Sequence, residues 1–209
     1  MSQNFKDKLI KAYNVDAVRR DNNESNRDVW KLSSREKFAA LLVKHNKHTL
    51  LELGSGAGID AKYFVDMGFD VLATDLSSEM VKVCKSRGVN AKVADLYMLE
   101  DLGQKFDAVY SMNVLLHVPR SDLSKVLKTI SNILNPQGLF YYGVYGGFDS
   151  EEEITDNSKM GLPRFFSFLA DDTLSSIVKP YFNVISFESI EFSSTRKGLK
   201  FQSLILQKP

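Results

Sequence analysis

The sequence contains very little cysteine, almost no excess charge and no long hydrophobic run. Cys84 is the single cysteine among 209 residues, so an internal disulfide is impossible. Lys and Arg number 27 against 26 for Asp and Glu, which gives a net charge of +1 and no general attraction for nucleic acid. No apolar run could span a bilayer, and the amino terminus lacks the apolar core of a secretory signal. We therefore expect a cytoplasmic protein that does not bind a membrane. Nucleic acid is a disfavoured partner.

Metal and hydrolase chemistry also lack support in the sequence. One cysteine and three scattered histidines offer no ligand spacing, and the acidic run 151–153 is typical of a solvated charged segment. Ser55 lies between two glycines but outside the G-x-S-x-G elbow that a Ser-His-Asp hydrolase would require. We expect no metal site.

What the sequence does contain is an alternation of strand-like and helix-like runs, which predicts an α/β fold with a largely parallel sheet and helices on both faces. Its length and its 44% hydrophobic content suit one domain over residues 1–209. We expect a helical extension over 1–47 and a sheet-containing core over 48–209. Strands are predicted at 49–53, 69–74, 90–94, 107–111 and 138–144.

The second half of the chain carries further signals. Apolar residues at helical spacing predict a helix that Ser121 caps and that Pro136 and Gly138 stop. A helix over 172–178 and an antiparallel hairpin of 182–192 with 200–207 follow. The stretch 146–163 is predicted to be irregular, as part of a lid-like insertion of about 146–165. In the extension, two helical segments flank a polar loop at 21–26.

The apolar run Leu50–Leu53 leads into three alternating glycines, Gly54, Gly56 and Gly58. Such a run predicts a buried strand, and the glycines allow a sharp turn and a close approach of a ligand to the backbone before the next helix. Asp75 ends the next apolar run, where an acid can accept both hydroxyls of a ribose. The pattern predicts a site for a nucleoside cofactor.

The glycine spacing indicates which cofactor. A dinucleotide fingerprint needs glycine where Ile59 stands. A carboxylate at Glu52 would repel a pyrophosphate but attract an ammonium or sulfonium group. A dinucleotide oxidoreductase is therefore disfavoured, and the ligand should carry positive charge.

These residues resemble the first motif of the class I S-adenosylmethionine-dependent methyltransferases. The resemblance continues at 93–96, 106–117 and 134–138. It implies a Rossmann-like doubly wound sheet of seven strands in the order 3-2-1-4-5-7-6, with strand 7 antiparallel. It also implies S-adenosyl-L-methionine as the cofactor.

The resemblance further implies roles for individual residues. Gly54 and Gly56 would let the methionine part of the cofactor lie on the loop, and Glu52 would reach its ammonium. Asp75 would accept hydrogen bonds from the ribose hydroxyls, and the alternative is that it caps a helix. Asp95 would accept a hydrogen bond from the adenine amino group, and the alternative is that it forms a turn. The full set of expected cofactor residues is Glu52, Gly54, Ser55, Gly56, Gly58, Asp75, Leu76, Asp95, Leu96, Ser111, Met112, Asn113 and Arg35.

Several residues could serve the acceptor side of the site. His117 follows the fourth strand and is either a general base or a packing residue. Tyr13, Trp30 and Arg35 belong to the extension, which in related enzymes folds over the cofactor as a lid. There Arg35 would pair with the methionine carboxylate or else lie on a solvated helix face. Tyr145 and Arg164 flank the irregular stretch and could contact substrate, with Arg164 holding an anionic group or else pairing with nearby acids.

The sequence thus predicts a methyltransferase that acts on a small-molecule acceptor by in-line displacement. A tRNA or protein acceptor is the alternative within the same class, and a cofactor-binding protein without turnover is the alternative outside it. The oligomeric state is left open.

Overall fold

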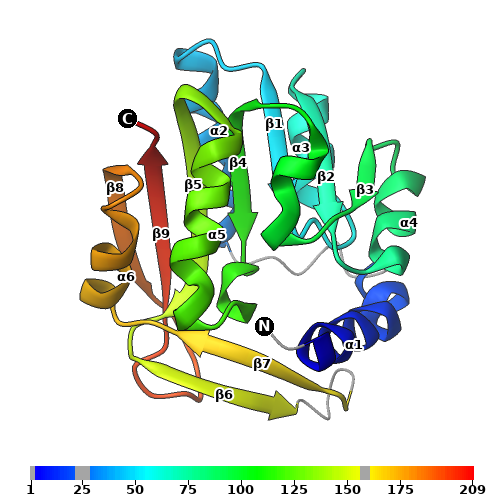
Figure 1. Cartoon of the computed structure of the whole chain (residues 1–209), viewed down its shortest axis with the longest axis vertical. Helices are drawn as coiled ribbons and strands as arrows, with labels where there is room; N and C mark the ends of the chain where they lie inside the picture. The colour runs from blue at the N-terminus through cyan, green and yellow to red at the C-terminus, as the bar shows by residue number, and fades with distance from the viewer. Residues whose placement is uncertain (1–2, 22–28, 156–160) are drawn as a thin grey trace.

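The computed structural model describes residues 3–21, 29–155 and 161–209, and its main feature is a seven-stranded sheet in the order β3-β2-β1-β4-β5-β9-β8 (Figure 1). The first five strands in this order pair in parallel, while β9 is antiparallel to both β5 and β8. Counted within this sheet alone, the order is 3-2-1-4-5-7-6, so the predicted topology is confirmed. The strands are β1 (Thr49–Leu53), β2 (Asp70–Asp75), β3 (Ala91–Val93), β4 (Phe106–Met112), β5 (Leu134–Gly146), β8 (Asn183–Glu191) and β9 (Lys200–Gln207).

Helices cover both faces of the sheet because the side chains of each strand alternate between two cores. Leu50 and Tyr110 face a core that α2, α3 and α4 complete, whereas Leu51 and Val109 face a core that α5 and α6 complete. The helices are α1 (Gln3–Asp21), α2 (Val29–Lys44), α3 (Ile59–Asp66), α4 (Ser78–Ser86), α5 (Arg120–Ile133) and α6 (Asp171–Val178), with short 3-10 turns η1 (Leu96–Leu102) and η2 (Leu115–His117).

The boundaries of α5 differ from the predicted ones. The helix begins at Arg120 with Pro119 in the capping position, so the prediction of Ser121 as the cap is wrong. Proline suits a helix start because its fixed φ is compatible with that geometry and it has no N–H to satisfy. Pro136 and Gly138 do not stop the helix either, since β5 has already begun at Leu134 and contains both. The register between β4 and β5 shifts here, which lets the strand include the proline.

The stretch 146–163 is not irregular throughout, as the sequence had suggested. Residues Ser150–Thr155 form β6, which pairs with β7 (Pro163–Phe168) in a separate antiparallel two-stranded sheet. Exposure alternates along β6, but hydrophobicity does not, because glutamates at 151–153 occupy both exposed and half-buried positions. The sequence therefore lacks the period-2 pattern that would have predicted this strand. The predicted polar loop at 21–26 lies, apart from Asp21, outside the described residues.

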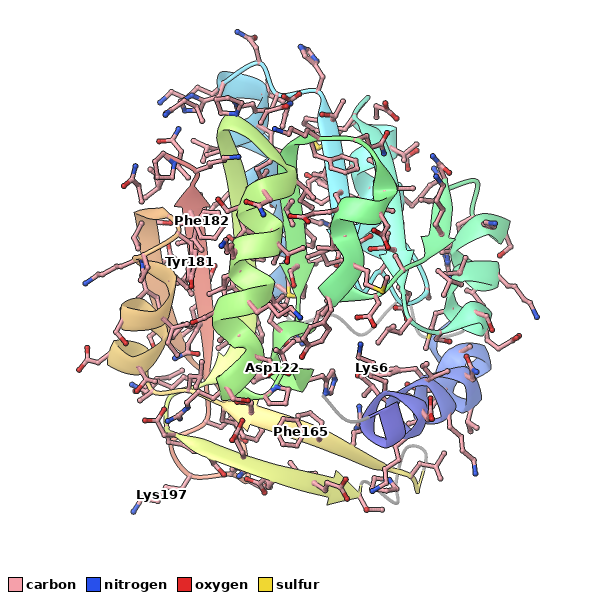
Figure 2. All side chains as sticks on the ribbon, in the orientation of Figure 1. Lys6, Asp122, Phe165, Tyr181, Phe182 and Lys197 are labelled. Carbon is pink, nitrogen blue, oxygen red and sulfur yellow. The ribbon has the colours of Figure 1, made fainter. Side chains whose placement is uncertain are left out.

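The two-stranded sheet and α1 lie at the end of the molecule to which the carboxyl ends of the parallel strands point (Figure 1). Helix α1 packs against both α4 and β7. Figure 2 labels Lys6 of α1 and Phe165 of β7 at this end. In the part of the chain that the structure describes, no helix is long and apolar enough to cross a membrane.

Candidate functional site

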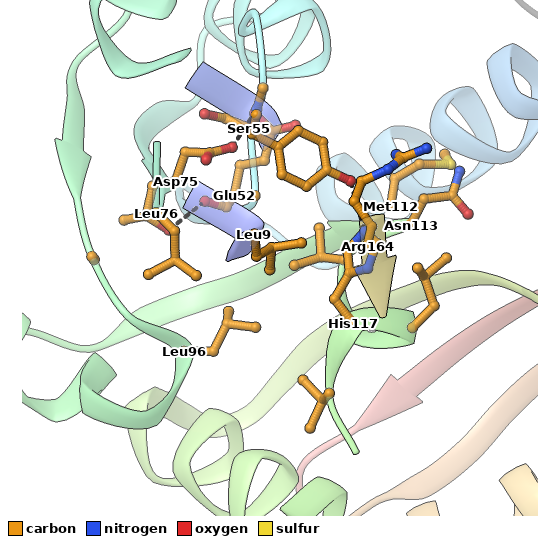
Figure 3. A pocket seen from close by; sticks show the side chains of 18 of the residues that line it. Leu9, Glu52, Ser55, Asp75, Leu76, Leu96, Met112, Asn113, His117 and Arg164 are labelled. Carbon is orange, nitrogen blue, oxygen red and sulfur yellow. Dashed lines mark hydrogen bonds between the residues drawn. The ribbon is translucent and has the colours of Figure 1, made fainter. Parts of the chain in front are cut away.

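A cavity of about 560 Å³ opens at the carboxyl ends of β1, β2 and β4, between the sheet and α1 with β7 (Figure 3). Parallel α/β sheets bind ligands at this edge. The structure brings together most of the residues that the sequence singled out. Those that line the cavity are Tyr13, Glu52, Gly54, Ser55, Gly56, Asp75, Leu76, Asp95, Leu96, Met112, Asn113, His117, Tyr145 and Arg164.

The first two glycines of the loop shape the floor of this cavity. Gly54 has a φ of +60°, and a Cβ there would come within 2.3 Å of the Cγ2 atom of Val114. Gly56 has a φ of +53°, and its N–H donates to Oδ2 of Asp75 at 2.9 Å. Left-handed backbone without side chains leaves the loop open to a ligand that lies directly on it.

Gly58 has a different role, because it does not line the cavity. It precedes α3 in a left-handed conformation with a φ of +78°, and a Cβ there would lie 2.5 Å from Sγ of Cys84 in α4. The third glycine of the motif thus allows the start of α3 to approach Cys84 closely, and the expectation that it contacts the cofactor receives no support from its position.

Asp75 is held in a fixed orientation at the edge of the cavity. Its Oδ2 accepts from the N–H of Gly56, and its Oδ1 accepts from the N–H of Ser77 at 2.8 Å. The cap of α4 is supplied by Ser77 itself, whose hydroxyl accepts from the N–H of Met80 at 3.1 Å. Each carboxylate oxygen has a second lone pair, so Asp75 can join the two loops and still accept hydrogen bonds from a ligand.

Two other acids mark the same half of the cavity. Glu52 ends up only 3% exposed, with its side chain in the wall beside the glycine loop. Asp95 caps η1 by accepting from the N–H of Tyr97 at 3.0 Å, and it also forms an ion pair with Lys6 of α1. Burial and a hydrogen bond to Asp122 raise the pKa of Tyr97, so this ring stays a neutral part of the wall.

Arg35 and Ser111, by contrast, are not among the lining residues. The guanidinium of Arg35 lies 3.8 Å from the centre of the Tyr63 ring and donates to Oδ1 of Asp60 at 2.9 Å. Arg35 is buried, so the alternative of a solvated helix face is wrong, and its position does not support contact with the cofactor. Asp60, in the first turn of α3, is the member of this ion pair that reaches the cavity.

His117 connects three parts of the cavity wall. Its Nδ1 lies 2.7 Å from the carbonyl oxygen of Phe165, and its Nε2 lies 2.6 Å from the hydroxyl of Tyr13. A carbonyl can only accept, so Nδ1 carries a hydrogen, and in the neutral ring Nε2 then accepts from the Tyr13 hydroxyl. The chain Tyr13–His117–Phe165 thus joins α1, η2 and β7.

The rest of the wall is aromatic and positively charged. Arg164 of β7 lies over the rings of Phe166 and Tyr13, at 5.2 and 5.8 Å from their centres. Trp30 does not itself line the cavity but packs against Tyr145, with 6.2 Å between ring centres. The ammonium of Lys31 lies 4.8 Å from the centre of the Trp30 ring.

Sequence reasoning missed several lining residues, among them Lys6 and Leu9 of α1, whereas Tyr13 of the same helix was predicted. Lys6, Leu9 and Tyr13 are separated by three and four positions, which places them on one face of the helix. That spacing was a usable signal, but a mixed polar and apolar face does not stand out in a hydrophobicity pattern. The other missed residues include Arg19, Lys31, Asp60, Tyr97, Leu116, Val118 and Phe166.

Comparisons with known proteins agree with this geometry. Residues 51–142 match the family described as a methyltransferase domain. The ubiquinone biosynthesis O-methyltransferase of Xanthomonas oryzae pv. oryzae is 32% identical over 99 residues, which are 44% of this chain and 41% of that protein. The chain thus matches well under half the length of this relative.

Solved structures show the same fold over nearly the whole chain. Magnesium protoporphyrin IX methyltransferase from Synechocystis PCC 6803 has a TM-score of 0.68 at 16% identity, with 98% of this chain and 97% of that chain covered. The 1,6-didemethyltoxoflavin-N1-methyltransferase of Burkholderia thailandensis has a TM-score of 0.66 at 20% identity, with 97% and 86% covered.

Over residues 51–142, the family match thus agrees with the resemblance to the class I S-adenosylmethionine-dependent methyltransferases. The sheet has the strand order of their Rossmann-like fold. The glycine loop and the acid that ends β2 occupy the edge of the sheet where that fold binds its ligand.

Proposed function

We propose that this protein transfers a methyl group from S-adenosyl-L-methionine to a small-molecule acceptor. The observation that carries the proposal is one cavity with two chemically different halves. The loop of Gly54 and Gly56 with Glu52 and Asp75 forms one half, and the aromatic and basic side chains of α1 and β7 form the other.

The residues of the first half fit the cofactor. The open backbone at Gly54 and Gly56 would take the methionine part, and the buried carboxylate of Glu52 would attract its ammonium. Asp75 would accept hydrogen bonds from the ribose hydroxyls, and Asp95 would accept one from the adenine amino group. Leu76 and Leu96 lie in the wall near these two acids and would pack on the adenine.

When bound, the cofactor supplies an activated methyl group on a sulfonium. The protein then needs chiefly to align the acceptor with that methyl and to exclude water. The carboxyl end of β4 contributes Met112 and Asn113 to this part of the wall, and the N–H of Asn113 donates to the carbonyl of Gly143, which fixes the turn. Lys6 and Tyr13 of α1 close the cavity from the other side.

The Tyr13–His117 pair would accept the proton that an acceptor hydroxyl or amine loses. As the acceptor gives its proton to the Tyr13 oxygen, Tyr13 would pass its own proton to Nε2 of His117. The resulting imidazolium would keep its Nδ1 hydrogen bond to the carbonyl of Phe165. This makes His117 the catalytic residue of the proposal, with Tyr13 in contact with the acceptor.

We assign the whole chain to one methyltransferase domain. In the extension 1–47, helix α1 serves as a lid, and β7, which begins within the insertion of about 146–165, forms the opposite wall of the acceptor half. Two contacts of α1 support the lid: Lys6 forms an ion pair with Asp95 of the cavity wall, and Asn14 accepts a 2.6 Å hydrogen bond from the hydroxyl of Ser77, which caps α4.

A transfer assay tests the proposal. The protein is incubated with cofactor carrying a tritiated methyl group and with cell extract separated into small-molecule, RNA and protein fractions. We expect label in the small-molecule fraction. Label in RNA or protein alone would show that the acceptor belongs to that class and is not a small molecule. If the protein binds the cofactor but labels no fraction, a cofactor-binding protein without turnover would be favoured.

A further inference from the structure

Arg164 is a buried cation whose charge nothing in the described residues neutralises. It is 8% exposed, and its Nε atom is buried without a hydrogen-bond partner. Its contacts are with the faces of aromatic rings, those of Phe166 and Tyr13. A buried guanidinium without an anion is costly, because desolvation of the charge is not offset by a paired carboxylate.

Three other arginines in the described part of the chain differ from Arg164 because each forms an ion pair with a carboxylate. Arg35 pairs with Asp60, and Arg19 makes two hydrogen bonds to Asp16. Arg196 also lies on ring faces, those of Phe148 and Phe168, but it forms an ion pair with Glu152. The arrangement at Arg164 thus leaves its fork of donors available to a ligand in the cavity.

The acids of the cavity lie in its other half. Glu52 lies in β1, Asp75 ends β2 and Asp95 follows β3, whereas Arg164 belongs to β7. In Figure 3 the labels of Arg164 and His117 lie on one side of the cavity and those of Asp75 and Leu76 on the other. An anion at Arg164 would therefore lie on the acceptor side, away from the carboxylates.

The surroundings of Arg164 also indicate the shape of this ligand. The guanidinium contacts the rings of Phe166 and Tyr13, and both rings pack against His117, with ring centres 4.9 and 5.6 Å from that of His117. Aromatic faces beside a guanidinium suit a planar molecule that carries an anionic substituent. The fork of an arginine matches the two oxygens of a carboxylate.

We propose that Arg164 binds the carboxylate of the methyl acceptor, and that the acceptor is a planar small organic acid. This inference rests on the proposed function, because it names the substrate class of the same cavity. The carboxylate of the cofactor itself is the competing ligand, and the test separates the two.

The probes are benzoate, a planar carboxylate, and benzamide, its neutral counterpart of the same shape. Binding of each is followed by NMR titration of the protein saturated with S-adenosylhomocysteine. We expect benzoate to bind at least tenfold more tightly than benzamide. In Arg164→Gln this preference should disappear, and in Arg164→Lys it should be only partly restored, because a point charge lacks the fork.

Arg196→Gln is the matched control, since it removes another arginine that lies on ring faces but does not line the cavity. It should keep the preference for benzoate. Equal binding of the two probes to the wild-type protein, no binding of benzoate, or a preference that survives in Arg164→Gln would each overturn the inference.

A second titration separates the inference from the proposed function. S-adenosylhomocysteine carries a carboxylate, whereas 5′-methylthioadenosine does not. We expect Arg164→Gln to bind both within about twofold of the wild-type affinity. If it loses affinity for the first alone, Arg164 holds the cofactor, which overturns the inference while the proposed function stands. Failure of the wild-type protein to bind either adenosyl ligand would instead contradict the proposed function, and the two probes can then be compared on the protein alone.

Discussion

Replacing Gly58 by alanine should weaken folding strongly and cofactor binding little. Two costs add at this position. A left-handed conformation costs alanine about 1–2 kcal/mol, and the new Cβ would lie 2.5 Å from Sγ and 3.1 Å from Cα of Cys84. Overpacking of this kind costs about 1–3 kcal/mol. The free energy of unfolding should therefore fall by about 2–5 kcal/mol, a large part of the roughly 5–15 kcal/mol of a typical domain.

Thermal unfolding measures this effect, with an expected fall in Tm of roughly 4–20 °C. Gly88→Ala is the control, because Gly88 has nearly the same φ, +79°, but no atom within 4 Å of its hypothetical Cβ. Its loss should be limited to the conformational cost. Cys84→Ala should recover part of the loss in the double variant, because it removes the nearest atom.

Calorimetry with S-adenosylhomocysteine then asks whether the third glycine contacts the cofactor. We expect the folded Gly58→Ala protein to keep its affinity within about threefold. If Gly58→Ala lowers the free energy of unfolding no more than Gly88→Ala does, the packing argument is refuted. If it instead lowers the affinity for S-adenosylhomocysteine tenfold with unchanged stability, Gly58 contacts the cofactor.

Three further predictions concern the site and the sheet. Asp75→Ala removes charge-assisted hydrogen bonds that are each worth about 1.5–3 kcal/mol, so the Kd for S-adenosylhomocysteine should rise at least about tenfold; an unchanged Kd in the folded variant would restrict Asp75 to joining the two loops. Burial opposes ionisation of Asp107, but hydrogen bonds from His48, Asn135 and Thr49 lower its pKa from 3.8 to about 2. Because this folded-state pKa is depressed, the carboxylate stabilises the fold above about pH 4 and loses that effect toward pH 2, so the difference in unfolding free energy between wild type and Asp107→Asn should shrink over that range; a constant difference would contradict it. His117→Ala should lower kcat by roughly 10²–10⁴ with a hydroxyl acceptor, once one is identified, and leave cofactor binding unchanged; a normal kcat would make His117 a packing residue.

The strands and the cofactor half of the cavity could be predicted because their signals are local, whereas the strand order was implied by the family resemblance. The apolar run before Gly54 and the one before Asp75 each mark a buried strand and its carboxyl end. In a parallel sheet such ends meet at one edge, so the residues that follow them converge without any knowledge of side-chain contacts.

The acceptor half could not be predicted in the same way, because long-range packing forms it. Nothing in the local sequence shows that Tyr13 meets His117 across 104 positions, or that Phe165 lies beyond it. Arg35 is a residue for which the local sequence and the long-range packing differ. Its place ahead of the first strand suggested a cofactor contact, but Asp60 of α3 binds its guanidinium.

The strand β6 was missed for a further physical reason. It pairs only with β7, at one edge of its own small sheet, so it has no buried face that would give a clear apolar alternation. Its glutamates instead make contacts outside the main core, such as Glu152 with Arg196 and Glu153 with Lys8.

The most direct test of the account is a pair of calorimetric titrations with S-adenosylhomocysteine and with NAD. The buried carboxylate of Glu52 beside the glycine loop favours a nucleoside with a positively charged amino-acid arm over a pyrophosphate, and Ile59 stands where a dinucleotide loop needs glycine. We predict one-to-one binding of S-adenosylhomocysteine with a Kd in the micromolar range or below, and no heat from NAD. Binding of NAD without a response to S-adenosylhomocysteine would contradict the account.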